Sequence, residues 1–444
     1  MASLEPPPSL NRYSGVIERL NTIRLHGTVS QVIGIMVESR GPAARLGELC
    51  EIHCKRNAPP VLAEVVGFRE NGVLLMPLGE MEELAPGSAV VATGSSLKVG
   101  VGPDLLGRVL DGLGRPLDGL GPIDAQDRML VGRTPPHPLG RRRIAEPLSF
   151  GIRAVDAALT CGRGQRIGIF AGSGVGKSTL LGMIARNSDA HVNVIALVGE
   201  RGREVRDFLE KDLGPEGLAK SVVVVATSDQ VAVARLRAAM VATSIAEYFR
   251  DQGKDVMFIM DSVTRVAWAQ REIGLATGEP PTTRGYTPSV FAMLPKLLER
   301  SGTAEQGSIT GLYAVLVEGD DMNEPVADAV RSILDGHIVL SRDLAHANHY
   351  PAIDVLSSVS RLMPDVTTDE HRKAAAMLRD VLATYKSAED MINIGAYTDG
   401  SNPKIDHAKA HIEAIASFLR QGTHDNAPYS QTIAALEDLF RAEQ

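Results

Sequence analysis

"IFAGSGVGKSTLL", residues Ile169 to Leu181, places a glycine-rich loop between an apolar strand and the start of a helix. The glycines let backbone N–H groups turn inward and approach β- and γ-phosphates, and the start of the helix adds its positive end. The lysine supplies a point charge, and the hydroxyl that follows it can ligate magnesium. We therefore predict a phosphate-binding loop that consists of Gly172, Ser173, Gly174, Val175, Gly176, Lys177, Ser178 and Thr179.

One position departs from the G-x-x-x-x-G-K-[ST] pattern of such loops, because Ala171 stands in place of the first glycine. This position needs a small side chain more than a positive φ, so we expect the loop to tolerate alanine. The strand "RIGIF" before the loop and a helix that opens at Lys177 supply the structural context that a phosphate loop requires.

Two carboxylates follow other apolar strands and complete the predicted site. In "VMFIMDS", Asp261 stands at a strand tip, from which a carboxylate reaches magnesium through water in such folds; with Ser178 it forms the predicted metal site. In "VGERGREV", Glu200 also follows a strand and can accept a proton from an attacking water. Arg201 and Arg203 can face the phosphates, although a solvated turn with internal ion pairs is the alternative for this segment.

The composition is that of a globular protein of two or three domains, with 444 residues, 44% hydrophobic and 23% charged. A net charge of -8 argues against a surface that is wholly a nucleic-acid footprint, but it leaves room for a local basic channel. Three scattered cysteines form no disulfide framework, and "CEIHC" lacks the second ligand pair of a metal site. Without a long apolar run or a secretory signal, we expect a protein of the cytosol or of its membrane face.

Two segments are predicted before the phosphate loop. In residues 1–22, a Pro-rich start is followed by an apolar stripe from Leu10 to Leu20, which indicates a short helix. This helix either rests on its own domain or docks a partner. Residues 23–95 hold short apolar runs separated by Gly, Pro and Asn, a pattern typical of a small β-barrel.

Two more segments complete the expected α/β organisation. Residues 96–364 begin with a Gly- and Pro-dense connector at 102–119 and then alternate apolar strands with helices, which predicts a parallel-sheet nucleotide domain. Residues 365–444 lose the strand signal and read as amphipathic helices, so we expect a helical C-terminal domain.

A series of long motifs follows the phosphate loop in a characteristic order: "GERGREV", "MDSVTR", "GEPPTTRGYTPSVF", "EGDDMNEPVAD", "DGHIVLSR" and "YPAIDVLSSVSR". In this order the chain resembles the catalytic subunits of rotary ATP synthases, and more closely the ATPases of flagellar and type III protein export. "ATSDQ" at 226–230 and "INIGAYTDGSNPKID" at 392–406 are most similar to the flagellum-specific branch. The resemblance covers nearly the whole chain and implies a RecA-like nucleotide domain between a β-barrel and a helical domain.

The resemblance also implies roles for particular residues in Mg²⁺-dependent ATP hydrolysis. Glu200 matches the family's general base, and Arg201 stands beside it. Arg361 matches an arginine that reaches a neighbouring subunit's ATP, and Tyr350 matches an aromatic that stacks on adenine. From the residues alone, Arg361 indicates a surface ion pair and Tyr350 a half-buried aromatic at a strand end.

For partners, the resemblance implies a homohexameric ring at the cytoplasmic face of the inner-membrane export apparatus. A regulatory, stator-like export subunit is expected at the N-terminus and a central stalk subunit in the ring. The export gate membrane proteins, export substrates and their chaperones are the other expected partners, and nucleic acid is not expected.

The sequence leaves three rival functions. An injectisome secretion ATPase has the same chemistry in another apparatus. A ring-shaped nucleic-acid motor of the terminator-helicase type needs base-stacking aromatics in its barrel, where residues 24–93 hold only Phe68. A non-catalytic ring subunit would lack the carboxylate base, which is present here as Glu200.

Overall fold

The computed structural model describes residues 26–54, 58–69, 72–81 and 84–441. The chain divides between Leu97 and Lys98 into two compact units. The predicted docking segment at 1–22, with its stripe from Leu10 to Leu20, lies outside the described residues.

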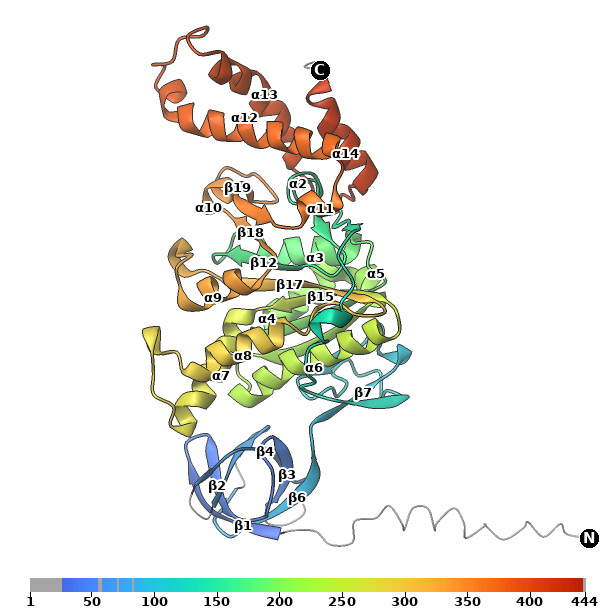
Figure 1. Ribbon diagram of the computed structural model, residues 1–444. Coiled ribbons are helices and arrows are strands. Elements are labelled where there is room, and N and C mark those ends of the chain that lie inside the picture. Colours follow the sequence, from blue (N-terminus) through green and yellow to red (C-terminus); the bar gives the residue numbers. More distant parts are fainter. Residues whose placement is uncertain (1–25, 55–57, 70–71, 82–83, 442–444) are drawn as a thin grey trace, which may run out of the picture. The chain divides into compact units, whose positions relative to one another are not determined.

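The first unit is a closed barrel of antiparallel strands in the order β1-β2-β5-β4-β3-β6 (Figure 1). The strands are β1 (His26–Ile33), β2 (Met36–Arg40), β3 (Glu48–His53), β4 (Val61–Arg69), β5 (Gly72–Pro77) and β6 (Ala89–Ser96). In β2, Val37 and Ser39 are buried and their neighbours are less so, which is the period of two of a strand that lines a core. The barrel core contains Val29, Val37, Cys50, Ile52, Ala63, Val65, Val73, Leu75 and Val90.

The second unit is built around a sheet in the order β19-β18-β12-β17-β15-β13-β14-β8, with β16 paired to β17. Neighbours along this order run parallel, except for the antiparallel pair β18 and β19. The strands are β8 (Val109–Asp111), β12 (Arg166–Ala171), β13 (Val192–Glu200), β14 (Ser221–Thr227), β15 (Asp255–Asp261), β16 (Gly302–Thr303), β17 (Ser308–Leu316), β18 (Gly336–Leu340) and β19 (Ile353–Ser360). All of β13 is buried, as expected for a strand covered on both faces.

Helices and short strands surround this sheet (Figure 1). The helices are α2 (Arg153–Ala158), α3 (Lys177–Asn187), α4 (Gly202–Asp207), a π-helix η3 (Phe208–Leu213), α5 (Gly214–Ala219), α6 (Ala232–Asp251), α7 (Val263–Thr277), α8 (Pro288–Leu298), α9 (Pro325–Ile333), α10 (Arg342–His346) and α11 (Met363–Val366). Paired short strands lie outside the main sheet: β7 (Lys98–Val101) with β9 (Asp127–Leu130), and β10 (Pro147–Leu148) with β11 (Cys161–Gly162).

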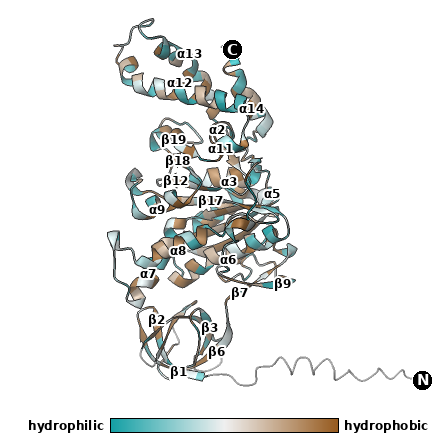
Figure 2. Ribbon diagram, in the orientation of Figure 1, coloured by the Kyte–Doolittle hydropathy of each residue, from teal (hydrophilic) through white to brown (hydrophobic). Residues whose placement is uncertain are grey.

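The chain ends in helices α12 (Asp369–Asn393), α13 (Pro403–Leu419) and α14 (Tyr429–Asp438), along which hydrophilic and hydrophobic residues alternate (Figure 2). Their apolar faces join the core of the nucleotide domain through residues such as Leu378 and Ile415. Polar contacts add to this attachment, because Arg379 Nη2 donates to the carbonyl oxygen of Ala158 at 2.7 Å. Among the described residues, no helix is both long and apolar enough to cross a membrane.

The fold class predicted from the sequence is confirmed: a β-barrel precedes a parallel-sheet domain, which a helical domain follows. The segment 102–119 differs in detail from the loop-rich connector that we expected. It is largely turns, but it contains β8, which pairs with β14 and extends the sheet. A strand of only three residues, set among glycines and prolines, leaves too short an apolar run to be recognised.

Candidate active site

The phosphate loop joins β12 to α3 and has the geometry that its glycines permit. Gly176 precedes the helix with φ 90°, a left-handed conformation that favours glycine, and leaves Lys177 as the first residue of α3. Ala171 is the last residue of β12 and pairs with Leu316 and Leu340 on the two neighbouring strands. Because extended strand backbone suits any residue, the alanine that replaces the first glycine of the pattern fits without strain.

The two predicted carboxylates lie at the same edge of the sheet as the phosphate loop. Strands β12, β13 and β15 are parallel in the sheet order, so their carboxyl ends point the same way. Glu200 is the last residue of β13 and Asp261 the last residue of β15, opposite Leu197 in the register. The edge therefore gathers both acidic side chains near the start of α3.

Lys177 and the two carboxylates form a charged cluster. The ammonium group of Lys177 makes an ion pair with Asp261 and lies 3.7 Å from Glu200 Oε1. Arg265, in the first turn of α7, approaches the other Glu200 oxygen, Oε2, at 3.3 Å. Because Asp261 is only 2% and Glu200 only 8% exposed, these charges interact with little screening by water.

The pKa of the Glu200 carboxyl group is raised to near neutral pH. Burial raises its pKa to about 7, and the negative charge of Asp261 adds to this effect, while Lys177 and Arg265 oppose it. Glu204 also hydrogen-bonds to this carboxyl group. Among the described residues, Glu200 Oε1 has no hydrogen-bond partner. The carboxyl group therefore combines a pKa near neutrality with an oxygen that can bind a water molecule.

Gly199 sets the direction of Glu200. Its φ of 72° lies in the left-handed region, and the pairing of β13 with β14 shifts by one residue between Val198 and Glu200. A Cβ atom at this position would lie 2.8 Å from Cδ of Arg265. Glycine thus permits both the bulge that turns the end of the strand and the close packing of Arg265 on it.

A cavity of about 500 Å³ opens over this cluster. It is lined by the phosphate loop, by Lys177, Ser178, Thr179 and Glu200, and by residues of the next elements: Glu204, Arg265, Trp268, Leu316, Val317, Glu318, Gly319 and Arg342. Its size is within the range of small-molecule sites, and its polar groups converge from several strands. Such a cavity suits a chain of phosphates.

A second, more apolar cavity of about 260 Å³ adjoins the first, since both are lined by Gly176 and Thr179. Leu180, Met183, Leu340 and Ala352 contribute to its wall, and Tyr350 is 41% exposed at its side. A Cβ atom on Gly176 would lie 3.6 Å from the Tyr350 ring, so the ring stands beside the phosphate loop. An aromatic face in an apolar cavity is suited to stacking against a flat ring.

Two predicted residues lie away from the cluster. The Arg201 side chain is 80% exposed, pairs with Glu204 at 3.8 Å and does not line the cavity. Arg361 follows β19 at the amino edge of the sheet, where its N–H donates to the carbonyl oxygen of Asp335 at 3.0 Å. The length of β12, five steps at ~3.3 Å each, therefore separates Arg361 from its own phosphate loop by about 16 Å along the strands.

The structure also adds residues that the sequence did not assign. Arg265 and Glu204 contact Glu200, and Arg342 lies so close to the loop that a Cβ on Gly172 would be 2.7 Å from its Nη2. Arg265 closes "MDSVTR" and Arg342 closes "DGHIVLSR". An arginine just beyond the tip of an apolar strand is the signal that both share.

Family profiles match three parts of the chain. The ATP synthase alpha/beta family, nucleotide-binding domain, matches residues 151–360, and the beta-barrel domain of the same family matches residues 29–94. The T3SS EscN ATPase C-terminal domain matches residues 367–438.

Whole-chain relatives include proteins of two kinds. The flagellum-specific ATP synthase of Bacillus subtilis (strain 168) is 57% identical over 435 residues, which cover 96% of this chain and 98% of that protein. The type 3 secretion system ATPase of Sinorhizobium fredii is 48% identical over 433 residues, which cover 97% of this chain and 96% of that protein.

Solved structures agree with these similarities. The assembled ATPase EscN from the type III secretion system of enteropathogenic E. coli has a TM-score of 0.87 and 48% identity, covering 93% of this chain and 99% of that chain. A structure of EscN in complex with its central stalk EscO gives the same values. The likeness spans the barrel, the sheet and the C-terminal helices.

Proposed function

The chain belongs to the ATP synthase alpha/beta family, and from this premise we propose that it is the ATP-hydrolysing subunit of a flagellar type III protein export apparatus. The observation that carries the proposal is the cluster of Lys177, Glu200 and Asp261 beside the phosphate loop. The 57% identity to a flagellum-specific relative favours the flagellar apparatus. An injectisome ATPase is the second candidate, favoured by the EscN-type C-terminal domain.

Hydrolysis in this site divides between binding and proton transfer. The backbone N–H groups of the loop and the Lys177 ammonium hold the β- and γ-phosphates. Glu200 accepts a proton from the water that attacks the γ-phosphorus, for which its raised pKa is suited. Arg265, beside Glu200, keeps the carboxylate turned toward the cavity. These contacts keep the reacting groups close without a covalent intermediate.

Magnesium fits the polar groups at the start of α3. The Ser178 residue lines the cavity, and Asp261 offers a buried carboxylate at the adjoining strand end. Hard oxygen ligands of this kind are what Mg²⁺ prefers. When bound, the ion neutralises charge that develops on the phosphate oxygens. Tyr350, in the adjoining apolar cavity, is proposed to stack on the base of the nucleotide.

Arg361 is proposed to act on the ATP of a neighbouring subunit in a homohexameric ring. The position of Arg361 at the edge opposite its own phosphate loop supports this role. The assembled state of the EscN relative supports a ring, and its complex with EscO supports a central stalk partner. Arg201, exposed beside Glu200, is proposed to contribute at the same subunit boundary.

The remaining partners and the location follow from the proposed apparatus. Residues 1–22 would bind a regulatory, stator-like export subunit. The ring would work in the cytoplasm, at the inner-membrane face of the apparatus, where it meets the export gate, export substrates and chaperones. Complementation of a motility defect in a strain that lacks its flagellar ATPase separates this proposal from the injectisome alternative.

The test of the ring is enzymatic. ATPase activity per subunit is expected to rise steeply with protein concentration, because only assembled subunits have complete sites. Arg361→Ala subunits should bind ATP but lose turnover, since the lost contact stabilises mainly the transition state. Mixing them with Lys177→Ala subunits should restore part of the activity. Activity that is independent of concentration, with no rescue in the mixture, would contradict a trans role for Arg361.

A further inference from the structure

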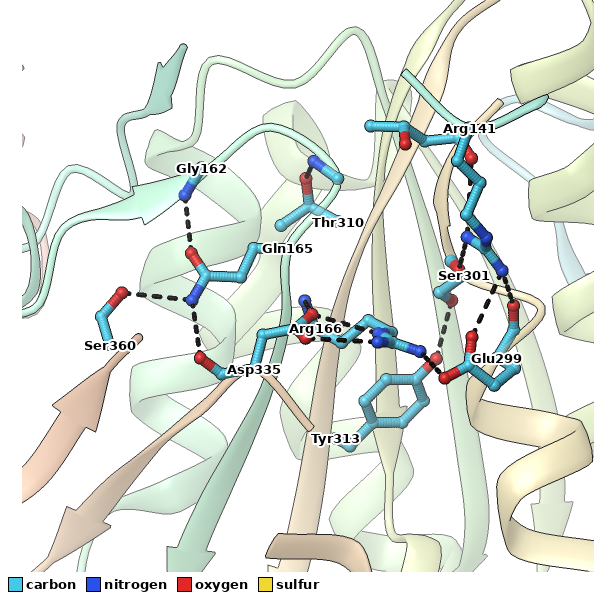
Figure 3. Close-up of polar contacts among 12 residues, drawn as sticks. Arg141, Gly162, Gln165, Arg166, Glu299, Ser301, Thr310, Tyr313, Asp335 and Ser360 are labelled. Atoms are coloured by element: carbon cyan, nitrogen blue, oxygen red, sulfur yellow. Dashed lines mark hydrogen bonds and ion pairs between the residues drawn. The ribbon is translucent and has the colours of Figure 1, made fainter. Parts of the chain in front are cut away.

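A polar network at the amino edge of the sheet joins Gln165 and Asp335 to Ser360, the residue before Arg361 (Figure 3). At its centre, the fully buried Gln165 makes three hydrogen bonds through its side-chain amide. Its Oε1 accepts from the N–H of Gly162 at 2.8 Å. Its Nε2 donates to the carbonyl oxygen of Asp335 and to Ser360 Oγ, both at 3.1 Å. One side chain thus joins the start of β12 to the end of β19.

These bonds fix the backbone on both sides of the Ser360–Arg361 peptide. Ser360 Oγ donates onward to the carbonyl oxygen of Thr160 at 2.8 Å. The carbonyl oxygen of Asp335 accepts from Gln165 Nε2 and also from the N–H of Arg361, at 3.0 Å. The Gln165 amide therefore contacts the residue before Arg361 and the group to which Arg361 is bonded.

Arg166, which follows Gln165 and begins β12, holds the Asp335 side chain. Arg166 Nε and Nη2 donate to the two Asp335 carboxylate oxygens at 3.1 and 3.2 Å, and its N–H donates to Oδ2 at 3.1 Å. The Arg166 guanidinium also makes an ion pair with Glu299 (Figure 3). Bidentate pairs of this kind combine strength with a defined direction. Gln165 and Arg166, two consecutive residues, therefore hold Asp335, whose carbonyl oxygen accepts from the N–H of Arg361.

The Arg361 side chain contrasts with its anchored backbone. It is exposed, and none of the hydrogen bonds or ion pairs found in the described part of the chain involves its guanidinium. A residue with a fixed backbone and a guanidinium that forms no contact within its own subunit is suited to act on a neighbouring subunit. Its pre-organised backbone lowers the entropy lost when that contact forms.

We propose that Gln165 and Ser360 are positioning residues for Arg361, which they aim at the nucleotide of the neighbouring subunit. This inference rests on the proposed trans role of Arg361. Neither residue lines the subunit's own cavity. We therefore expect a change in either residue to lower ATP turnover at the neighbour's site and not at the subunit's own site. If the network only supplied hydrogen-bond partners to polar groups at the strand ends, its loss would lower the free energy of unfolding and leave ATP turnover at the neighbour's site unchanged.

The test uses mixed rings of the full-length chain, in which the site and the arginine come from different subunits. Arg361→Ala subunits carry an intact phosphate loop, and Lys177→Ala subunits supply Arg361 to them. Ser360→Ala is then added to the Lys177→Ala subunit alone. We expect the rescued kcat to fall about 10- to 100-fold, the effect of a small misplacement, with KM for ATP unchanged. Gln165→Glu, which loses both Nε2 donors, should act in the same way.

Two matched changes in the same supplying subunit serve as controls. Ser360→Thr keeps the hydroxyl and should keep the rescue. Ser357→Ala removes a hydroxyl from the same strand, one bonded to Asp354 instead of Gln165, and should also keep it. Light scattering and thermal melting establish that each variant folds and assembles. If Ser360→Ala does not assemble, Gln165→Glu decides the question.

The outcomes separate this inference from the function on which it rests. Full rescue by assembled Ser360→Ala and Gln165→Glu subunits would overturn the positioning role and leave the trans role of Arg361 standing. Absence of rescue by the Lys177→Ala subunit alone would overturn the trans role itself. Reduced rescue with Ser360→Ala, restored with Ser360→Thr, is the result that supports the inference.

Discussion

At the carboxyl edge of the sheet, Glu200 Oε1 has no hydrogen-bond partner among the described residues, and its carboxyl group has a pKa of about 7. At the amino edge, by contrast, both polar atoms of the Gln165 amide are bonded, and Asp335 accepts from Arg166 through both oxygens. At the carboxyl edge, a buried carboxylate oxygen lacks a hydrogen-bond partner, which substrate can supply. The amino edge pairs its carboxylate, amide and hydroxyl groups, and of its described atoms only Arg166 Nη1 relies on an ion pair, with Glu299, in place of a hydrogen bond.

This difference suggests a division of labour between the two ends of one strand. β12 begins at the network around Gln165 and Arg166 and ends at Ala171, before the phosphate loop. An unpartnered buried carboxylate belongs where bonds change, and satisfied hydrogen bonds belong where a residue must be aimed. Changes at the carboxyl edge should therefore cost turnover, and changes at the amino edge should cost stability or act on a neighbour.

The largest effect is expected for Lys177→Ala. Loss of the ammonium group removes the charge that holds the phosphates, so ATP binding should weaken and kcat/KM should fall at least about 10³-fold. Isothermal titration and a phosphate-release assay measure the two quantities. Lys296→Ala, at an exposed lysine of α8, is the control. Retained turnover in Lys177→Ala would remove the carboxyl edge from catalysis.

Next in size is Glu200→Gln, which keeps the shape of the side chain and removes the proton acceptor. ATP binding should persist while kcat falls about 10²- to 10⁴-fold. Glu216→Gln, at an exposed position of α5, should retain normal turnover. Normal hydrolysis by Glu200→Gln would exclude Glu200 as the general base, whatever its pKa.

A smaller effect is expected from pH. Because only the carboxylate of Glu200 accepts a proton and its pKa is raised to about 7, kcat/KM should fall about tenfold per pH unit below that value. A pH profile of the wild-type chain at subsaturating ATP measures this. A flat profile between pH 5.5 and about 7 would contradict the assignment.

The same raised pKa has the opposite consequence for stability. The folded protein keeps the Glu200 proton up to about pH 7, whereas a Glu in the unfolded chain releases it near its ordinary pKa of 4.5. The contribution of this group to stability is therefore lost as the pH rises through that window. Without ATP, Glu200→Gln should melt at a higher temperature than wild type at about pH 8, and the gain should vanish below the pKa of an unfolded Glu. If Glu200→Gln and wild type had the same melting temperature at about pH 8 as well as at low pH, burial would not destabilise the charged form of Glu200.

The smallest effect is expected for Tyr313→Phe, because Tyr313 lies in the middle of β17 and only its hydroxyl reaches the amino-edge network, at Ser301. The buried Tyr313 hydroxyl donates to Ser301 Oγ at 2.7 Å, and its loss should lower the free energy of unfolding by about 1 kcal/mol, as measured from urea midpoints. ATP turnover by the assembled enzyme should not change. A clear loss of turnover would mean that the two edges are not as separate as their contacts indicate.

The residues of the carboxyl edge could be grouped from the sequence for a physical reason. Glu200 and Asp261 each stand at the end of an apolar run, Lys177 follows another such run across the glycine-rich loop, and parallel strands bring these ends to one edge. The barrel and the C-terminal helices are also recognisable, because their patterns of period two and period 3.6 are regular.

The amino edge could not be predicted in this way. Gln165 and Ser360 lie 195 positions apart, and nothing in the local pattern of either indicates the other. Strands β18 and β19 mix buried and half-exposed residues, so they lack the continuous apolar run that marks the central strands. The link between Arg265 and Glu200 depends on the bulge at Gly199, which periodicity does not show.

The two ends of β12 also have a consequence for genetics. In a ring of mixed subunits, we expect a lesion at Lys177 to inactivate the site of the subunit that carries it, and a lesion at Gln165 or Ser360 to weaken the site of a normal neighbour. Two alleles that each fail alone, one with a lesion at each edge, would therefore complement each other in a single cell. Two alleles with lesions at the same edge would not. A strain with one normal and one amino-edge allele would show semi-dominance, because part of its normal subunits would sit beside a defective donor.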